Sequence, residues 1–480
     1  MTLTDYISAA PEITLLGLIC VVLIADLFVD DESRILTFWM TIAALAITMW
    51  TLLTTAPTER LVLFDGSYVS DPLSQILKVT AVGFVGIALM YARDYLRANH
   101  LHKGEFYILG LFGLLGMMIM ISANSLLTMY LGLETLALSL YALVAIDRNN
   151  VTSAESAMKY FVLGAIASGA LLYGISWVYG VTGTLKFDEI AMALAANPEM
   201  NSLPLWFGLA FLIVGISFKF GAVPFHMWLP DVYQGARTPV TLYIASAPKL
   251  AALAFTLRVL TDGLGGLHDV WADMIMVVAV LSLLVGNIIA IAQTNIKRML
   301  GYSTIAHVGF ILLGVFCGND KGNAAALFYT LTYIVAAAGA FGIVILLSRR
   351  GFEAENLSDF KGLNARSPWF ALMMMFLMFS LAGVPPFIGF FGKLNVIDAV
   401  LSSGYPGLAI LMVLASVVGA FYYLRVIWYM YFEPTEDMAV LQSSADTRLV
   451  LSLNSLAVLA LGIVPGWLWT LCSQIALSIR

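Results

Sequence analysis

The sequence predicts an all-α protein that crosses a membrane about fourteen times. Of its 480 residues, 61% are hydrophobic and only 11% are charged, whereas a soluble domain carries roughly 25% charged residues. Apolar runs long enough to cross the hydrocarbon layer as a helix, which takes about 20 residues, recur from end to end. Because no polar stretch is long enough for a soluble domain, we expect a single polytopic membrane domain over residues 1–480.

Fourteen apolar segments are expected to form the membrane helices. In chain order they cover residues 12–29, 35–55, 71–92, 105–122, 124–146, 157–180, 204–234, 239–261, 268–292, 300–317, 323–348, 367–404, 406–431 and 449–470. No nucleotide-binding loop interrupts them, so an energy source is expected in a partner subunit or an ion gradient. The three cysteines, Cys20, Cys317 and Cys472, are far apart, and we expect core residues rather than a metal site or disulfides.

The basic residues predict the orientation, because cytoplasmic loops carry an excess of Lys and Arg. If the N-terminus faces outward, thirteen basic residues fall in inner loops, and they are Arg34, Arg93, Arg97, Lys103, Arg148, Arg237, Lys297, Arg298, Arg349, Arg350, Lys361, Arg366 and Arg448. The outer loops and the C-terminus then carry four, which are Arg60, Lys186, Lys321 and Arg480. We therefore expect both termini on the outer, periplasm-like side.

The seventh and twelfth segments are longer than a bilayer requires and contain prolines. Segment seven contains Pro224, and segment twelve contains Pro385 and Pro386. Proline removes a backbone donor and clashes with the preceding turn. Each segment is therefore expected to be two half-helices joined by an unwound stretch, whose carbonyls must be satisfied by protein or by a water-filled cavity.

The spacing of these breaks suggests an internal repeat. They are five helices apart, and an odd offset reverses the orientation across the membrane, so we expect two inverted five-helix units, as in many transporters. The units would cover 105–262 (helices four to eight) and 263–432 (helices nine to thirteen), with helices one to three at 1–104 and helix fourteen at 433–480. The alternative is two unrelated proline kinks, since the halves show only weak self-similarity.

Five ionisable residues lie deep inside apolar segments, where burying a charge costs roughly 2.5–3.5 kcal/mol. They are Glu134 in segment five, Lys219 in seven, Lys249 in eight, His307 in ten and Lys393 in twelve. Several such groups in one chain indicate a path for ions or protons. The alternatives are a structural ion pair for Glu134 and a satisfied core position for His307.

Lys219 precedes the predicted break in segment seven and Lys393 follows the one in segment twelve, whereas Lys249 lies about ten residues into segment eight. Burial in an apolar region disfavours the charged form of a lysine, whereas a nearby carboxylate favours it. We therefore expect Lys219 to respond to charge changes at Glu134, and His307 to relay protons between the two halves. Lys249 is too central for its side chain to reach an interface comfortably.

Three further residues are secondary candidates. Glu155 and Lys159 are four residues apart, in the better order for a helical ion pair, and the pair is either structural or the mouth of a proton uptake path. His226, two residues after Pro224, is the third.

Three further cations lie near or inside apolar segments. Arginine stays charged at any relevant pH, so Arg258 and Arg425 are expected to be structural partners or electrostatic tuners. Lys78 lies near the outer end of its segment, and we expect its side chain to extend to the interface.

Two motifs give the chain a family resemblance, PFHMWLPDVYQG at 224–235 and QTNIKRMLGYS at 293–303. With them, nearly the whole chain resembles the antiporter-like membrane subunits of respiratory complex I, the bacterial NADH-quinone oxidoreductase. The continuation Asp231-Val232-Tyr233 is similar to the subunit N branch, whereas the sister subunits L and M usually carry Asp-Ala. Ala236-Arg237 departs from the family pattern and puts only the local loop geometry in question.

The resemblance implies a proton-translocating subunit. In this family the glutamate of helix five, the lysines of helices seven, eight and twelve and the histidine of helix ten form the proton path, and they match Glu134, Lys219, Lys249, Lys393 and His307. Protons would be taken up from the cytoplasm and released on the other side, driven by quinone reduction elsewhere in the enzyme. No cofactor or metal is expected in this chain, while the complex is implied to use NADH, FMN, iron–sulfur clusters and a quinone.

The implied partners are other membrane subunits of the complex, notably M and K, the redox arm and the lipid of a bacterial inner (plasma) membrane, with no nucleic acid. Three alternatives share some of these features. They are a subunit of a multi-subunit cation/proton antiporter, a stand-alone secondary permease and a non-conducting membrane scaffold. Copurification with flavin, iron–sulfur and quinone-reducing partners would favour the oxidoreductase.

Overall fold

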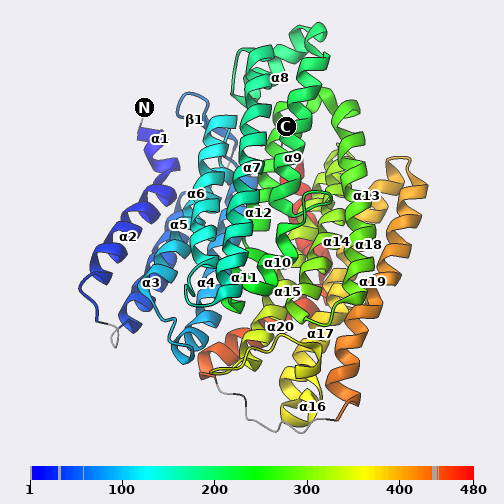
Figure 1. Cartoon of the computed structure of the whole chain (residues 1–480). Coiled ribbons are helices and arrows are strands. Elements are labelled where there is room, and N and C mark those ends of the chain that lie inside the picture. Colours follow the sequence, from blue (N-terminus) through cyan, green and yellow to red (C-terminus); the bar gives the residue numbers. More distant parts are fainter. Residues whose placement is uncertain (1–2, 31–33, 58, 435–440, 442, 480) are drawn as a thin grey trace.

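Almost the whole chain is helical in the computed structural model, which describes residues 3–30, 34–57, 59–434, 441 and 443–479. Figure 1 shows one bundle of upright helices, with both chain ends toward its upper part and α16 (Leu363–Arg366) at its lower end. Ends on one side agree with an even number of crossings. Which side faces the cytoplasm stays a prediction, and Arg480 lies outside the described residues.

The first hundred residues form one edge of the bundle. Their elements are α1 (Leu3–Ser8), α2 (Ala10–Asp26), α3 (Ile35–Thr54), the antiparallel strands β1 (Leu61–Leu63) and β2 (Tyr68–Ser70), and α4 (Pro72–Ala98). The prediction of core cysteines holds for Cys317 and Cys472 but is wrong for Cys20, which is exposed. Cys20 lies on α2, an edge helix that presents one face outward (Figure 1).

The remaining elements form the body of the bundle. The first group is α5 (Gly104–Ile121), α6 (Leu126–Val144), α7 (Val151–Thr182), α8 (Phe187–Ala196), a 3₁₀ turn (Pro198–Met200), α9 (Leu203–Phe220), α10 (Trp228–Gly235), α11 (Thr238–Ala245), α12 (Pro248–Leu257) and a π-helical turn (Arg258–Gly263). The second group is a 3₁₀ turn (Gly265–Leu267), α13 (His268–Ala292), α14 (Ile296–Phe316), α15 (Asp320–Leu347), a 3₁₀ turn (Leu357–Phe360), α16, α17 (Pro368–Ala382), α18 (Ile388–Ser402), α19 (Pro406–Phe432), α20 (Ala445–Ile463) and α21 (Pro465–Leu477).

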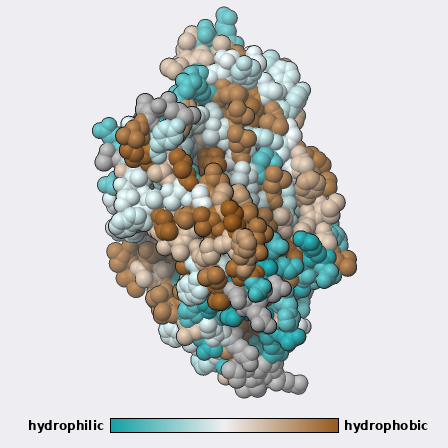
Figure 2. All heavy atoms as spheres, turned by 90° about the vertical axis from the view of Figure 1, so that its left-hand side faces the viewer, coloured by the Kyte–Doolittle hydropathy of each residue, from teal (hydrophilic) through white to brown (hydrophobic). Residues whose placement is uncertain are grey.

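The composition of the helices fits a membrane protein. Within the described residues, 12 helices are long and apolar enough to cross a membrane. The other two predicted segments are α2, which has 17 residues, and segment twelve, which is divided into α17 and α18 of 15 residues each. Fourteen crossings therefore stay a prediction. Figure 2 shows hydrophobic side chains gathered over the middle of one face, with hydrophilic ones toward its ends.

Both predicted breaks are present. α9 ends at Phe220 and α10 begins at Trp228, while α17 ends at Ala382 and α18 begins at Ile388. The residue that follows each first half is a glycine with a positive φ, Gly221 at 76° and Gly383 at 86°, a conformation that disfavours a side chain and commonly ends helices. The glycines therefore end the helices, and the prolines keep the following links from continuing them.

A third interruption, which the sequence analysis missed, divides segment eight. α11 ends at Ala245, Ser246 has φ −107° and ψ −100°, and α12 begins at Pro248. Pro248 has no backbone N–H to continue the helix. The break places Lys249 in the first turn of α12.

Glycines let helix backbones approach closely at matching places in the two proposed units. A Cβ on Gly116 of α5 would lie 2.5 Å from the backbone nitrogen of Leu136 on α6. A Cβ on Gly286 of α13 would lie 2.6 Å from the backbone nitrogen of Ala306 on α14. Both pairs are the first two helices of their unit, as an inverted repeat requires, although the repeat itself stays a prediction. Such close packing holds membrane helices together where lipid provides no hydrophobic drive.

Gly116→Ala should destabilise the protein, because the new methyl group meets backbone atoms that cannot move aside. We expect a cost of about 1–3 kcal/mol, typical of overpacked cores, and a lower thermal midpoint for the purified protein. Gly17→Ala is the control, since no atom lies within 4 Å of the Cβ at that position. Equal midpoints for the two variants would contradict the close α5–α6 contact.

Candidate functional site

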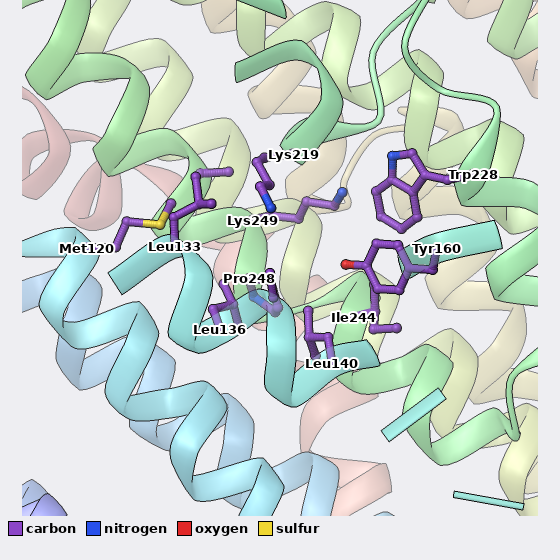
Figure 3. A pocket seen from close by; sticks show the side chains of 12 residues that line it. Met120, Leu133, Leu136, Leu140, Tyr160, Lys219, Trp228, Ile244, Pro248 and Lys249 are labelled. Atoms are coloured by element: carbon purple, nitrogen blue, oxygen red, sulfur yellow. The ribbon is translucent and has the colours of Figure 1, made fainter. Parts of the chain in front are cut away.

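A small buried cavity lies beside the first helix break (Figure 3). Its volume is about 30 Å³, room for roughly one or two water molecules. Side chains from seven helices line it, among them Lys219, Lys249, Tyr160 and Trp228. The structure thus brings two of the predicted site lysines, from α9 and α12, into one space.

Lys249 is bound to the end of the broken helix. Its side chain is 2% exposed, and its Nζ donates a hydrogen bond to the carbonyl oxygen of Phe220 at 2.8 Å. Phe220 is the last residue of α9. The final carbonyls of a helix lack partners within it and carry the negative end of its dipole, so the ammonium group satisfies an acceptor that the break sets free.

Among the described residues, Lys219 has no such hydrogen-bond partner. Its Nζ lies 5.8 Å from the centre of the Phe218 ring and extends toward the cavity (Figure 3). Glu134 on α6 accepts a hydrogen bond from Ser168 on α7 and acts on Lys219 electrostatically. Within the described part of the chain no ion pair joins Lys219 to Glu134, so proton exchange between them requires an intervening group such as water.

Lys393 repeats the arrangement of Lys249 at the second break. Its side chain is buried, and its Nζ donates to the carbonyl oxygen of Ala382 at 2.8 Å. Ala382 is the last residue of α17. Lys393 also lies 5.5 Å from the centre of the Phe310 ring. Each break is therefore closed by one lysine that binds the last carbonyl of the preceding half-helix.

His307 is buried within a group of hydroxyl side chains. Its two ring nitrogens contact the hydroxyls of Tyr329 and Tyr423 at 2.7 and 2.9 Å, and its ring lies 4.9 Å from that of Tyr333. A cavity of about 10 Å³ is shared by His307, Tyr329 and Ser380. His307 therefore lies next to the second break, whereas the first cavity does not include it.

Two of the secondary candidates, Glu155 and Lys159, lie beside the start of α10. Lys159 pairs with Glu155 at 2.9 Å, which confirms the predicted helical ion pair. It also pairs with Asp231 at 3.0 Å, and Asp231 pairs with Arg298 of α14 at 2.6 Å. His226 is half-buried in the link between α9 and α10, and its Nδ1 has no hydrogen-bond partner among the described residues.

The sequence analysis missed Glu353, in the loop between α15 and α16. Its carboxylate accepts hydrogen bonds from the hydroxyls of Tyr95 and Thr238 and lies 3.2 Å from Arg237 and 3.8 Å from Lys297. These partners belong to α4, to the start of α11 and to α14, so one carboxylate ties three parts of the bundle together. The departure from the family pattern at Arg237 was the available signal.

The charge on Glu353 is stabilised by this setting. Burial opposes ionisation, but Lys297, the two hydroxyls and Arg237 together outweigh it and lower the pKa of Glu353. Because the pKa is lowered on folding, the stabilisation is fully present at neutral pH and is lost only as the pH falls through the folded-state value.

Fixed ion pairs also occupy the other end of the bundle. Arg258 is fully buried and pairs with Asp71 at 2.7 Å and Asp262 at 3.1 Å, which confirms its structural role. The prediction that Lys78 extends to the interface is wrong, because its side chain is buried and pairs with Glu12. α2 covers that position on α4, which hydropathy alone does not reveal.

Arg425 also has the structural partners expected of it. It donates to the carbonyl oxygens of Ile291 and Gln293, at 2.8 and 2.7 Å, at the end of α13.

Comparisons with known proteins agree over nearly the whole chain. The family model for the transmembrane part of NADH:quinone oxidoreductases and Mrp antiporters matches residues 123–419. NADH-quinone oxidoreductase subunit N of Thioalkalivibrio sulfidiphilus is 53% identical, with 98% of each chain covered. Its counterpart in Thiobacillus denitrificans is 51% identical, with 99% of this chain and 98% of the relative covered. A chain of respiratory complex I from Thermus thermophilus superposes with a TM-score of 0.82 at 31% identity, covering 96% of this chain and 98% of that one.

Glu353→Gln should lower the stability of the assembled protein, because the four groups around the carboxylate lose the charge that they satisfy. Breaking a buried pair costs about 3 kcal/mol, measured as a lower thermal midpoint at pH 7. Glu155→Gln is the control, since Glu155 is 62% exposed and pairs at 2.9 Å with Lys159, which is 45% exposed, and an exposed pair contributes less than about 1 kcal/mol. Equal thermal midpoints for the two variants would show that Glu353 does not stabilise the loop between α15 and α16.

Proposed function

Because the chain belongs to the subunit N family of NADH-quinone oxidoreductases, we propose that its buried ionisable residues carry the protons that this enzyme moves across the membrane. It is an antiporter-like, proton-translocating membrane subunit of complex I. The proposed carriers are Glu134, Lys219, Lys249, His307 and Lys393.

One observation carries the assignment: Lys249 and Lys393 each bind the last carbonyl of a broken helix. No carboxylate forms an ion pair with either ammonium group among the described residues. A charge held by a carbonyl, not by a counter-ion, depends strongly on hydration and on nearby charges. Lysine can release its proton under such control, whereas arginine cannot. Both lysines are thus suited to change their charge during turnover.

The proposed route starts at the lower end of the bundle. Glu155 and Lys159, with His226 nearby, form the uptake mouth that leads to Glu134 and Lys219. From the first cavity the proton passes to Lys249 and on to His307. Lys393, beside the second break, hands it to the outer side. A charge change at each group alters the proton affinity of the next, so coupling is electrostatic.

The rest of the enzyme supplies the energy. The chain is a membrane-arm subunit, and we propose subunits M and K as its neighbours. We further propose that NADH, FMN, iron–sulfur clusters and a quinone act in other subunits. The excess of basic residues in one set of loops favours termini on the periplasmic side of the bacterial inner membrane. The family model also covers Mrp antiporters. The two relatives that are 53% and 51% identical over nearly the full chain are oxidoreductase subunits, which favours the oxidoreductase.

Lys249→Ala and Lys393→Ala should each lower proton pumping and coupled quinone reduction in the assembled complex. A positioned proton carrier contributes a factor of about 10²–10⁴ where transfer limits the rate, so we expect at least a tenfold loss, measured in inverted membrane vesicles. Lys249→Arg should also assemble without pumping normally, because the charge is kept and the proton is not released. Lys159→Ala should be milder. Full pumping by Lys249→Arg would show that the lysine is a fixed charge.

Glu134→Gln should also lower pumping while the complex still assembles. The amide keeps an acceptor for Ser168 but removes the charge that acts on Lys219. Glu189→Gln is the control, since Glu189 is 44% exposed and its pair with Lys186 lies outside the proposed route. Wild-type pumping by assembled Glu134→Gln would remove Glu134 from the path.

A further inference from the structure

Both ring nitrogens of His307 are held by tyrosine hydroxyls. Nδ1 lies 2.7 Å from Oη of Tyr329 on α15, and Nε2 lies 2.9 Å from Oη of Tyr423 on α19. The hydroxyl of Tyr423 also hydrogen-bonds that of Ser303, one turn before His307 on α14. Four side chains from three helices thus form one continuous hydrogen-bonded row in the order Ser303, Tyr423, His307 and Tyr329.

The row is sealed from solvent and contains no charged member. Its side chains are 2%, 1%, 6% and 3% exposed in that order. Neutral imidazole has one donor and one acceptor nitrogen, and a hydroxyl is both donor and acceptor. All the hydrogen bonds to the ring can therefore be satisfied without an imidazolium. No carboxylate hydrogen-bonds to His307 among the described residues, so nothing in the row favours a positive ring.

We propose that Tyr423 and Tyr329 are the proton donor and acceptor of His307, and that the ring passes protons while remaining neutral, by exchanging tautomers. This rests on the proposed function, in which His307 is a relay and Lys393 lies downstream of it. The tyrosines are new members of the path, and sequence reasoning had no means of finding them.

The step conserves protons and charge. At the start Tyr423 donates to Nε2, and Nδ1–H donates to Tyr329. The hydroxyl proton of Tyr423 moves to Nε2 while the proton on Nδ1 moves to Tyr329, which releases its own proton to a water molecule or to the neutral amine of Lys393. A proton that arrives from the side of Ser303 then replaces the one that the Tyr423 hydroxyl has donated. One proton has entered and one has left, and rotation of the hydroxyls with return of the tautomer resets the row.

Tyr329 and Lys393 lie near the same aromatic ring, that of Phe310. The Tyr329 ring stacks on Phe310 at 5.4 Å, and Lys393 Nζ lies 5.5 Å from that same Phe310 ring. The cavity of about 10 Å³ beside His307 and Tyr329 is also lined by Ser380 of α17 and Gly389 of α18. It has room for about one water molecule, which would extend the row toward the second break.

The test compares Tyr423→Phe, Tyr329→Phe and His307→Gln in the assembled complex. Phenylalanine keeps the ring and removes the hydroxyl, and glutamine keeps one donor and one acceptor without a tautomer to exchange. Tyr333→Phe is the matched control, because its ring lies 4.9 Å from His307 while its hydroxyl bonds Thr304. We expect at least about a tenfold loss of pumping in the first three, together with a larger solvent deuterium isotope effect, and near wild-type values for Tyr333→Phe.

The other outcomes would contradict either the tautomer relay or the proposed function, and the variants distinguish the two. If Lys249→Ala and Lys393→Ala lower pumping while Tyr423→Phe, Tyr329→Phe and His307→Gln do not, the tautomer relay is overturned and the proposed function stands. A loss in Tyr333→Phe equal to that in Tyr329→Phe, or an unchanged isotope effect, would mark a packing role and also overturn the relay. Normal pumping by both lysine variants would overturn the proposed function itself.

Discussion

Backbone carbonyls freed inside the bundle set the main physical constraint on this structure. A polar group buried without a partner costs several kcal/mol at membrane depth, yet α9 and α17 both end there. Lys249 and Lys393 answer that requirement by donating to the last carbonyls, those of Phe220 and Ala382. The same hydrogen bonds hold a titratable amine at each break, so the group that completes the fold is also the one able to exchange a proton.

The breaks stay in place because the lower end of the bundle is tied together by charge. Glu353 joins Tyr95, Arg237 and Lys297, which belong to different parts of the chain. Asp231 joins Lys159 of α7 to Arg298 of α14 at the start of the second half of the broken helix. A shift of α10 or α11 would break several of these pairs at once, so the short helices around Lys249 are held firmly although each is too short to be stable alone.

Hydropathy and proline placement were enough to predict the long apolar helices and the two breaks, because both signals are local. They also placed the buried ionisable residues on the correct helices. The third break at Ser246 was missed because segment eight is no longer than a bilayer requires, so its single Pro248 did not indicate two half-helices. The burial of Lys78 and the contacts of Glu353 and His307 depend on which helix lies opposite, and periodicity does not contain that information. Whether Glu134 and Lys219 form a direct ion pair depends on the distance between their side chains, and the sequence does not give that distance.

The positions of the arginines and lysines follow from the difference between a permanent charge and a charge that is lost when a proton leaves. Arg258 and Arg237 each pair with two carboxylates near the ends of the bundle, where a permanent charge locks elements together. Arginine in mid-bundle would place the same permanent charge against a neutral carbonyl, and no proton could leave to relieve it. Lysine at the breaks avoids that cost, since the amine can be neutral when its surroundings are dry. Lys78 shows the other case, because its carboxylate partner Glu12 fixes its charge. Whether a buried lysine is locked or exchangeable is therefore decided by the acceptor it meets, and at both breaks that acceptor is the end of a helix.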